Sequence, residues 1–217
     1  MRERPILFQG AMVRALLAET KTQTRRSVSP QPSQSFIPDG PTRNYSRTLV
    51  DLKTGEQYPD PVVRFGVTDE NEDYPCKFGR PGDRLWVKEC FSSHGAFGAH
   101  GLITYRADIA DGKEPHGLHW RPSIFMPRTA SRLLLEITAV RVERLNVITE
   151  ADAKAEGVEP MQENHTAAAV ASIFGAKEFA AHKSAYATLW EQINGRGSWA
   201  LNPWVWVIEF RRVAPAR

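Results

Sequence analysis

Residues 16–26 read Leu-Leu-Ala-Glu-Thr-Lys-Thr-Gln-Thr-Arg-Arg, and the rest of the chain is organised around them. The stretch begins as one face of an amphipathic helix and ends as a dense polar group with one lysine, three threonines and two arginines. Arginines beside a lysine disfavour its charged form and so lower its pKa. A threonine hydroxyl can act as a nucleophile or bind a phosphate. The stretch is therefore suited both to acyl chemistry and to nucleic-acid contact.

The composition indicates a single globular domain over residues 1–213, followed by a frayed tail at 214–217. Of the 217 residues, 41% are hydrophobic and 24% are charged, which is ordinary for a chain that buries one core. The formal net charge of +3 permits a nucleic-acid partner. A dedicated nonspecific binder usually carries a heavier basic stripe, so the charge does not demand one.

The cysteine and histidine content predicts no metal, no cofactor and a reducing compartment. Cys76 and Cys90 are too few for a disulfide framework, and with His94 they do not complete a zinc site. His116 and His119 have no carboxylate at a spacing that would complete a metal site, and we expect them to be loop histidines. The first residues lack a signal-peptide pattern, and no apolar run approaches membrane-spanning length. We therefore expect a cytoplasmic protein of a bacterial host cell, with no membrane partner.

Hydrophobic periodicity predicts a mixed α+β fold of about six strands and three or so helices. Because most strands are joined by short turns, the pattern is typical of a small, partly open β-barrel decorated by helices. Two long loop insertions, at about 27–75 and 91–130, interrupt it, and we expect a short hairpin at 58–67 within the first of them. We expect strands at 5–8, 84–90, 102–106, 133–145 and 204–210, and helices at 11–19, 149–157, 166–174 and 176–193.

Residues 17–26 resemble the opening motif of the ASCH domain, a PUA-like barrel. Four further segments agree in order with this family: its glycine-aspartate turn and strand, its long central strand, its short helix and its closing strand. The resemblance implies a PUA-like (ASCH) fold. The segments Trp120–Ser123 and Met126–Arg128 are similar to ASCH proteins of phages and prophages. The four agreeing segments are residues 81–87, 133–145, 148–156 and 204–210.

The resemblance also implies a chemistry. PUA-like barrels commonly bind RNA or modified nucleobases, and one small bacterial ASCH branch hydrolyses N4-acetylcytidine with a lysine, a threonine and a glutamate. Carried over by motif, these residues correspond to Lys21, Thr24 and Glu156. The present chain is much longer than that branch, and its insertions can reshape the pocket. The expected function is thus an amidohydrolase acting on an N4-acylated cytidine-type nucleoside or nucleobase.

The chemistry of these three side chains also supports a catalytic role for them. Amide cleavage needs a nucleophile, a base for its proton and an acid for the leaving amine. Thr24 offers the hydroxyl, Lys21 offers the base, and Glu156 can orient the lysine or carry the proton. A carboxylate in the last turn of a helix opposes the helix dipole at a cost of ~0.3–1 kcal/mol, so the position of Glu156 favours a functional role. We expect Lys21 and Thr24 to face Glu156 across a pocket.

Two other functions use much of the same surface. The basic residues can form a patch that contacts phosphates, as in a noncatalytic phage protein that binds RNA or modified bases, and a ribonuclease would need little more. Trp120 lies in a polar loop and is the best candidate for base stacking, whereas Trp86 reads more readily as core. The candidate residues for binding substrate or nucleic acid are Thr22, Arg25, Arg26, Trp86, Lys88, Trp120, Arg121 and Arg128.

Overall fold

The structure is a computed structural model that describes residues 1–32, 48–50, 57–59, 64–66, 73–93, 103–109, 113, 117–160 and 181–213. Three expectations therefore lie outside the described residues: the helix at 166–174, the beginning of the helix at 176–193 and the tail at 214–217. His94 and His116 also lie outside them. Within the described part of the chain, no helix is both long enough and apolar enough to cross a membrane.

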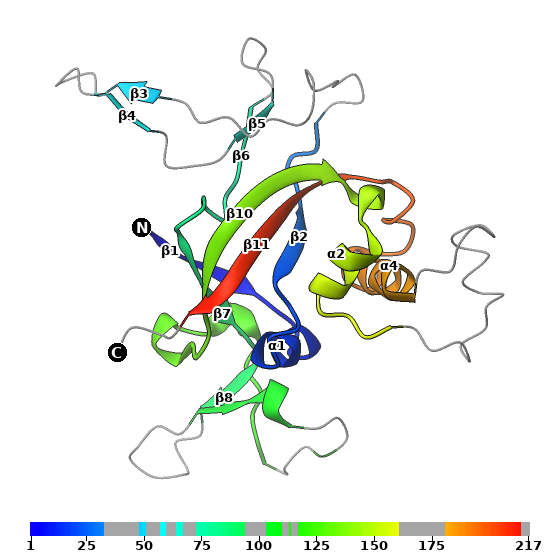
Figure 1. The fold of residues 1–217 in the computed structure, drawn as a ribbon. Coiled ribbons are helices and arrows are strands. Elements are labelled where there is room, and N and C mark those ends of the chain that lie inside the picture. The colour runs from blue at the N-terminus through cyan, green and yellow to red at the C-terminus, as the bar shows by residue number, and fades with distance from the viewer. Residues whose placement is uncertain are drawn as a thin grey trace.

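The fold is mixed α+β and is built on one five-stranded sheet (Figure 1). The strand order is β1-β7-β10-β11-β2, with β1 and β7 parallel and every other neighbouring pair antiparallel. The predicted α+β class is confirmed. For each of these strands except β2, both ends lie within three residues of the expected ends. The bounds are β1 (Glu3–Leu7), β2 (Gln23–Ser27), β7 (Arg84–Lys88), β10 (Leu134–Arg144) and β11 (Trp204–Val213).

The described strands do not close into a barrel. No backbone ladder among them joins the two edge strands, β1 and β2. A side chain bridges this gap instead, because Nη2 of Arg26 on β2 donates a hydrogen bond of 2.6 Å to the carbonyl oxygen of Leu7 on β1. The same guanidinium lies 5.2 Å from the ring centroid of Phe8. The sheet is therefore curled with its edges linked by polar contacts, and five strands rather than six belong to it.

In the stretch at 16–26, the helix ends earlier than the sequence predicts and a strand follows it. Helix α1 (Gly10–Leu17) ends two residues before the expected end, and Glu19 takes a positive φ of 59°. The polar group then forms edge strand β2. Thr22 holds the start of this strand in place, because its carbonyl accepts from Phe210 N at 2.9 Å while its own N–H donates to Ala155 O at 2.9 Å.

The register of β2 divides its side chains between two cores. Thr24 and Arg26 pair with Ile208 and Trp206, whose side chains belong to the larger core inside the curled sheet. Arg25 pairs with Val207, which belongs to the smaller core on the opposite face. That smaller core lies beneath helix α4 (Ala181–Asn194) and includes Tyr186, Trp190 and Trp199. Neighbouring residues of β2 therefore reach different sides of the sheet, as alternation in a strand requires.

Helix α2 (Glu150–Ala155) begins and ends as its sequence predicts. Thr149 is the N-cap and forms a capping box with Asp152, so that each side chain accepts from the other's backbone N–H. Gly157 follows the helix with a φ of +74°, a conformation that favours glycine. A Cβ at Gly157 would lie 2.7 Å from the Cβ atoms of both Ala15 and Lys21, so this glycine also allows α2 to pack against α1.

The first insertion differs from its prediction in two ways. It begins later than residue 27, since Val28 is buried in the larger core and Gln31 accepts from and donates to the backbone of Trp204. The hairpin expected at 58–67 is wrong, because its two halves pair elsewhere. Strand β4 (Gln57–Pro59) pairs with β3 (Thr48–Val50), and β5 (Arg64–Gly66) pairs with β6 (Asp73–Pro75).

The second insertion holds a small core of its own. Strand β8 (Phe91–Ser93) pairs with β9 (Ile103–Tyr105), and the side chains of Phe91, Met126 and Ala130 are buried together. The 3₁₀ turns η1 (Arg106–Asp108), η2 (Ser123–Phe125) and η3 (Arg128–Ala130) complete this region, and a fourth turn, η4 (Leu145–Val147), follows β10. The pair β8–β9 extends from the lower end of the sheet in Figure 1, on the side away from α2 and α4.

Candidate functional site

Lys21 and Glu156 form a buried ion pair between the lead-in to β2 and the end of α2. Nζ of Lys21 donates to Oε2 of Glu156 at 2.9 Å and to the backbone carbonyl of the same residue at 2.8 Å. The exposed fractions of the two residues are only 3% and 2%. Glu156 is the C-cap of α2, so the capping of this helix sets where the carboxylate lies. The structure thus brings these two candidate residues into direct contact.

The pKa of Lys21 is lower than that of an ordinary lysine. Burial is the main cause, because it disfavours the charged ammonium, and the charges of Arg26 and Arg25 act in the same direction. The carboxylate of Glu156 opposes this shift without cancelling it. A lowered pKa raises the fraction of Lys21 that is neutral at a given pH, and the neutral amine is the form that a general base needs.

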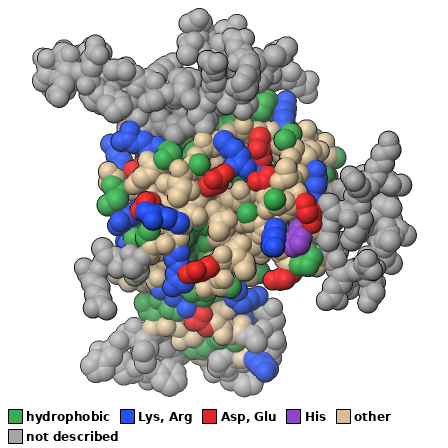
Figure 2. Space-filling view, viewed as in Figure 1, with side chains coloured by type: hydrophobic (Ala, Val, Ile, Leu, Met, Phe, Trp, Pro, Cys, Tyr) green, Lys and Arg blue, Asp and Glu red, His purple; other side chains and the backbone are tan. Residues whose placement is uncertain are grey.

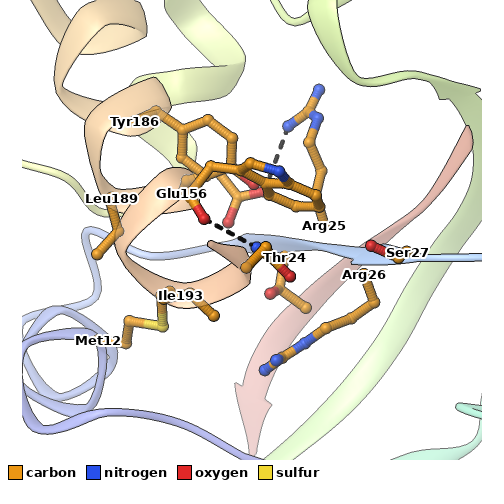
Figure 3. Close-up of a pocket in the computed structure, with 11 residues that line it drawn as sticks. Met12, Thr24, Arg25, Arg26, Ser27, Glu156, Tyr186, Leu189 and Ile193 are labelled. Atoms are coloured by element: carbon orange, nitrogen blue, oxygen red, sulfur yellow. Dashed lines mark hydrogen bonds and ion pairs between the residues drawn. The ribbon is translucent and has the colours of Figure 1, made fainter. Parts of the chain in front are cut away.

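Arg25 holds the other oxygen of Glu156. Its Nη1 lies 3.3 Å from Oε1 of Glu156, while its Nη2 contacts Glu143 at 2.5 Å and Asp152 at 3.4 Å. Figure 3 shows Arg25 extending toward Glu156 and Tyr186, whereas Arg26 extends the opposite way from the same strand. Glu156 is therefore fixed between two cations, and Arg25 is occupied by carboxylates instead of being available to a phosphate.

A network of charges behind Arg25 was not foreseen from the sequence. Arg141 contacts Glu143 at 3.3 Å and Asp152 at 3.0 Å, and it also pairs with Glu209. Gln23 joins the network by donating to Asp152 through Nε2. The one signal that could have indicated it is the alternation of β10, which places Arg141 and Glu143 on the same face.

Thr24 lines a small polar cavity of about 50 Å³ that also reaches Glu156 (Figure 3). Apolar side chains of α1 and α4 form the rest of the wall, and its other polar residues are Arg25, Arg26, Ser27, Tyr186 and Asn194. Thr24 is itself buried, with 3% of its surface exposed. No hydrogen bond between described residues joins its hydroxyl to Lys21 or Glu156. The three candidate catalytic residues thus share one neighbourhood, with Glu156 in contact with Lys21 and lining the same cavity as Thr24.

Arg26 is placed as a cation without a carboxylate. Apart from its hydrogen bond to Leu7, its guanidinium lines the cavity beside Thr24 and Ser27, and its buried Nε has no hydrogen-bond partner. Among the described residues, no salt bridge joins Arg26 to an acidic side chain. Thr22 differs from its neighbours because its side chain is exposed and borders a separate cavity of about 260 Å³ on the other side of Lys21.

Trp86 and Lys88 do not reach this site. They lie on β7, which β10 and β11 separate from β2, and they project from the face opposite to buried Leu85 and Val87. Nζ of Lys88 lies 5.4 Å from the ring centroid of Trp86 and donates to the carbonyl of Ile124. These two side chains therefore stabilise the contact between β7 and the second insertion.

Trp120, Arg121 and Arg128 also belong to that insertion; the first two have partners within it, and Arg128 has its partner on β1. The guanidinium of Arg106 lies 5.9 Å from the Trp120 ring, and that of Arg121 lies 5.5 Å from the ring of Phe91. Nε of Arg128 contacts Glu3 at 2.8 Å. The structure thus separates the candidate binding residues: Arg25 and Arg26 lie on β2 near Glu156, Thr22 borders a second cavity, and the other five lie around β7 and the second insertion.

No metal centre is evident in the described part of the chain, where no three His, Cys, Asp or Glu side chains are placed to share an ion. Both cysteines are free thiols, and burial raises the pKa of Cys76 to about 11. Such a thiol stays protonated and unreactive at neutral pH.

Comparison of the chain with known proteins finds no matching family model, no matching curated protein and no matching solved structure. The function must therefore be argued from the chemistry of the site together with the motifs of the sequence.

Proposed function

We propose that this chain is an amidohydrolase of the PUA-like ASCH type that cleaves the N4-acyl amide of a cytidine-type nucleoside or nucleobase. The observation that carries the proposal is the buried contact of 2.9 Å between Lys21 and Glu156, at a cavity that Thr24 lines. A buried amine of lowered pKa, a carboxylate and a hydroxyl are the groups that amide hydrolysis requires. The reaction consumes one water and yields a carboxylic acid and the free 4-amino group.

The fold supports the ASCH part of this proposal. A PUA-like domain is a small barrel, and here the curled sheet has its edge strands linked through Arg26 and Leu7. The motif at 17–26 supplies both the end of α1 and strand β2, and the motif at 148–156 supplies α2 with Glu156 at its end. The two motifs therefore meet at one place, as a shared active site would need.

The residues have the following roles in the proposed reaction. Neutral Lys21 takes the proton of the Thr24 hydroxyl as that oxygen attacks the acyl carbon. The carbon–nitrogen bond breaks, the acyl group remains on Thr24 as an ester, and N4 leaves with a proton that Glu156 relays from Lys21. Water then cleaves the ester and releases the acid. Catalytic hydrogen bonds often form only once substrate is bound, which accounts for the absence of one between Thr24 and Lys21 here.

Hydrolysis of N4-acetylcytidine by the purified protein tests the proposal. Lys21→Ala, Thr24→Val and Glu156→Gln should each lower kcat by about 10²–10⁴, because each removes a group that transfers a proton or forms a bond. Lys154→Ala is a matched control, since Lys154 is an exposed lysine on α2 two positions before Glu156. Circular dichroism should show that each variant remains folded. A wild-type protein that deacylates no N4-acylcytidine would exclude this function.

A second candidate is noncatalytic binding of RNA or of modified bases. The observation that favours it is Arg26, whose guanidinium lines the cavity beside two hydroxyls without a carboxylate partner among the described residues. Arginine suits phosphate in such a setting. On the face shown in Figure 2, basic and acidic side chains are interspersed, so this candidate rests on the cavity more than on a basic surface. RNA affinity that falls steeply with salt and survives Lys21→Ala would support it.

Ribonuclease activity is a further alternative, since a basic site with a hydroxyl could also cleave RNA. Incubation with labelled RNA would reveal it as shortened strands. For all three functions the expected location is the cytoplasm, and the two free thiols agree with a reducing compartment.

A further inference from the structure

A groove runs between α1 and α4 and ends at Glu156. Its volume is about 470 Å³, and its walls come from α1, from the residues that follow α2, and from α4. The half-buried wall residues are apolar: Met12, Ala15, Val158, Ala185 and Leu189. The polar side chains that border it (Gln9, Arg14, Thr20 and Glu159) are all exposed and form its rim. The groove therefore has an apolar interior and a polar edge.

The groove adjoins the cavity that Thr24 lines, because the two spaces share three wall residues. Glu156, Met12 and Leu189 border both spaces. Figure 3 shows Met12 coming from α1 and Leu189 from α4, both on the left of Glu156 in this view. A molecule held at Glu156 can thus extend in two directions: toward Thr24, Arg26 and Asn194, or along the apolar groove.

These two directions differ in the chemistry that they accept. The polar cavity offers a guanidinium, hydroxyls and an amide, which suit the oxygen and nitrogen atoms of a nucleobase. Among the described residues, the half-buried walls of the groove carry no polar side chain, so a hydrocarbon chain fits it best. An acetyl group would leave most of its volume unfilled.

We infer that the groove between α1 and α4 is an acyl subsite, and that the substrate is an N4-acylated cytidine with a straight acyl chain longer than acetyl. The inference rests on the proposed function, because it places the scissile carbonyl at Glu156 and Thr24. The chain beyond the carbonyl lies between Ala15 and Ala185 and is released as the fatty acid. The chemistry remains hydrolysis, with one water consumed for each amide cleaved.

A series of N4-acetyl-, N4-butanoyl- and N4-hexanoylcytidine tests the inference. Each methylene that enters the groove should raise kcat/KM by up to about fourfold, so the hexanoyl compound, with four more methylenes, should exceed the acetyl one by about 10-fold to 250-fold. Ala185→Leu fills the groove from α4 and should lower the ratio of hexanoyl to acetyl kcat/KM by about tenfold. Gln192→Leu is the control: it adds an equally apolar side chain to the same helix at an exposed position outside the groove, and should leave the ratio unchanged.

The outcomes separate this inference from the function on which it rests. Hydrolysis of the acetyl compound with no gain for longer chains would overturn the acyl subsite and leave the amidohydrolase proposal standing. A wild-type ratio in a folded Ala185→Leu variant would likewise overturn the subsite. No hydrolysis anywhere in the series would overturn both. Thermal unfolding of the two variants shows that they are folded.

Discussion

Nζ of Lys21 lies 2.9 Å from Oε2 of Glu156, although 135 positions of sequence separate the two residues. Neither charge is exposed, and each would be costly to bury alone. Arg25 contacts the second oxygen of Glu156, so one carboxylate forms ion pairs with two buried cations. This arrangement couples the chemistry of the site to the stability of the fold.

The pH dependence of the reaction should report Lys21. Lys21 accepts a proton only when it is neutral, so kcat/KM should rise with pH and level off above the lysine's pKa. Because burial lowers that pKa, the midpoint of the rise should lie below pH 10.5, the ordinary value. Kinetics with N4-acetylcytidine between pH 5 and 10 would measure it. A midpoint at or above 10.5 would contradict the assignment of Lys21 as the base.

Arg25→Gln should move this midpoint to higher pH. The variant removes a positive charge that lowers the pKa of Lys21, and it leaves the Glu156 carboxylate to act on the lysine alone. Arg141→Gln is the matched control, because Arg141 contacts Glu143 and Asp152 but not Glu156. An equal shift in both variants would mean that the whole network, and not the Arg25 contact, sets the pKa.

Glu156→Leu should destabilise the protein by about 3–5 kcal/mol, because it leaves the Lys21 ammonium buried without its carboxylate. The double variant Lys21→Met with Glu156→Leu should recover much of that loss, since both charges are then gone. Urea unfolding measures both free energies. The single variant Lys21→Met completes the cycle. If the free-energy losses of Lys21→Met and Glu156→Leu add up to the loss of the double variant, the pair is not energetically coupled.

Gly157→Ala should cost more than Gly195→Ala. Both glycines have positive φ, +74° and +96°, so either substitution incurs a backbone cost of about 1–2 kcal/mol. A Cβ at Gly157 also meets Ala15 and Lys21 at 2.7 Å, whereas one at Gly195 meets nothing within 4 Å. Overpacking should add about 1–3 kcal/mol at Gly157 alone. Equal free energies of unfolding would show that α1 and α2 are not tightly packed there.

Arg132→Met should destabilise the region around β8 and β9 strongly. Arg132 binds both oxygens of buried Glu89, at 2.9 and 3.0 Å, and also contacts Asp108. Its loss leaves Glu89 unpaired, at a cost of about 3–5 kcal/mol at neutral pH. Burial raises the pKa of Glu89, so the unpaired carboxyl is held protonated and neutral at low pH, and it must ionise while buried as pH rises.

The loss caused by Arg132→Met should therefore be smaller at pH 4 than at pH 8. Arg128→Met is the control for this variant, since the contact between Arg128 and Glu3 is exposed and should be worth less than about 1 kcal/mol. Urea unfolding of both variants at the two pH values makes the comparison. A loss that does not change with pH would exclude Glu89 as its source.

Local sequence determined the elements whose signals lie within a few residues. The capping box of Thr149 and Asp152 and the glycine at 157 gave α2 its ends, because these hydrogen bonds and this φ value depend on near neighbours. Alternation likewise predicted β7, β10 and β11, and the motifs selected Lys21, Thr24 and Glu156 as candidates. Each of these signals depends on residues that are close together in the sequence, so a single sequence is enough to detect them.

Tertiary structure alone decided how these elements meet. Residues 23–27 have no apolar alternation, and they form a strand because β11 offers an edge to pair with. The hairpin expected at 58–67 is wrong for a different reason: β4 pairs with the strand before it, β3, and β5 pairs with the strand after it, β6, so the local pattern predicted the wrong neighbour for each half. The partners of Arg25 come from β10 and α2, more than a hundred positions away. Long-range pairing depends on the packing of the whole chain, and no local pattern encodes it.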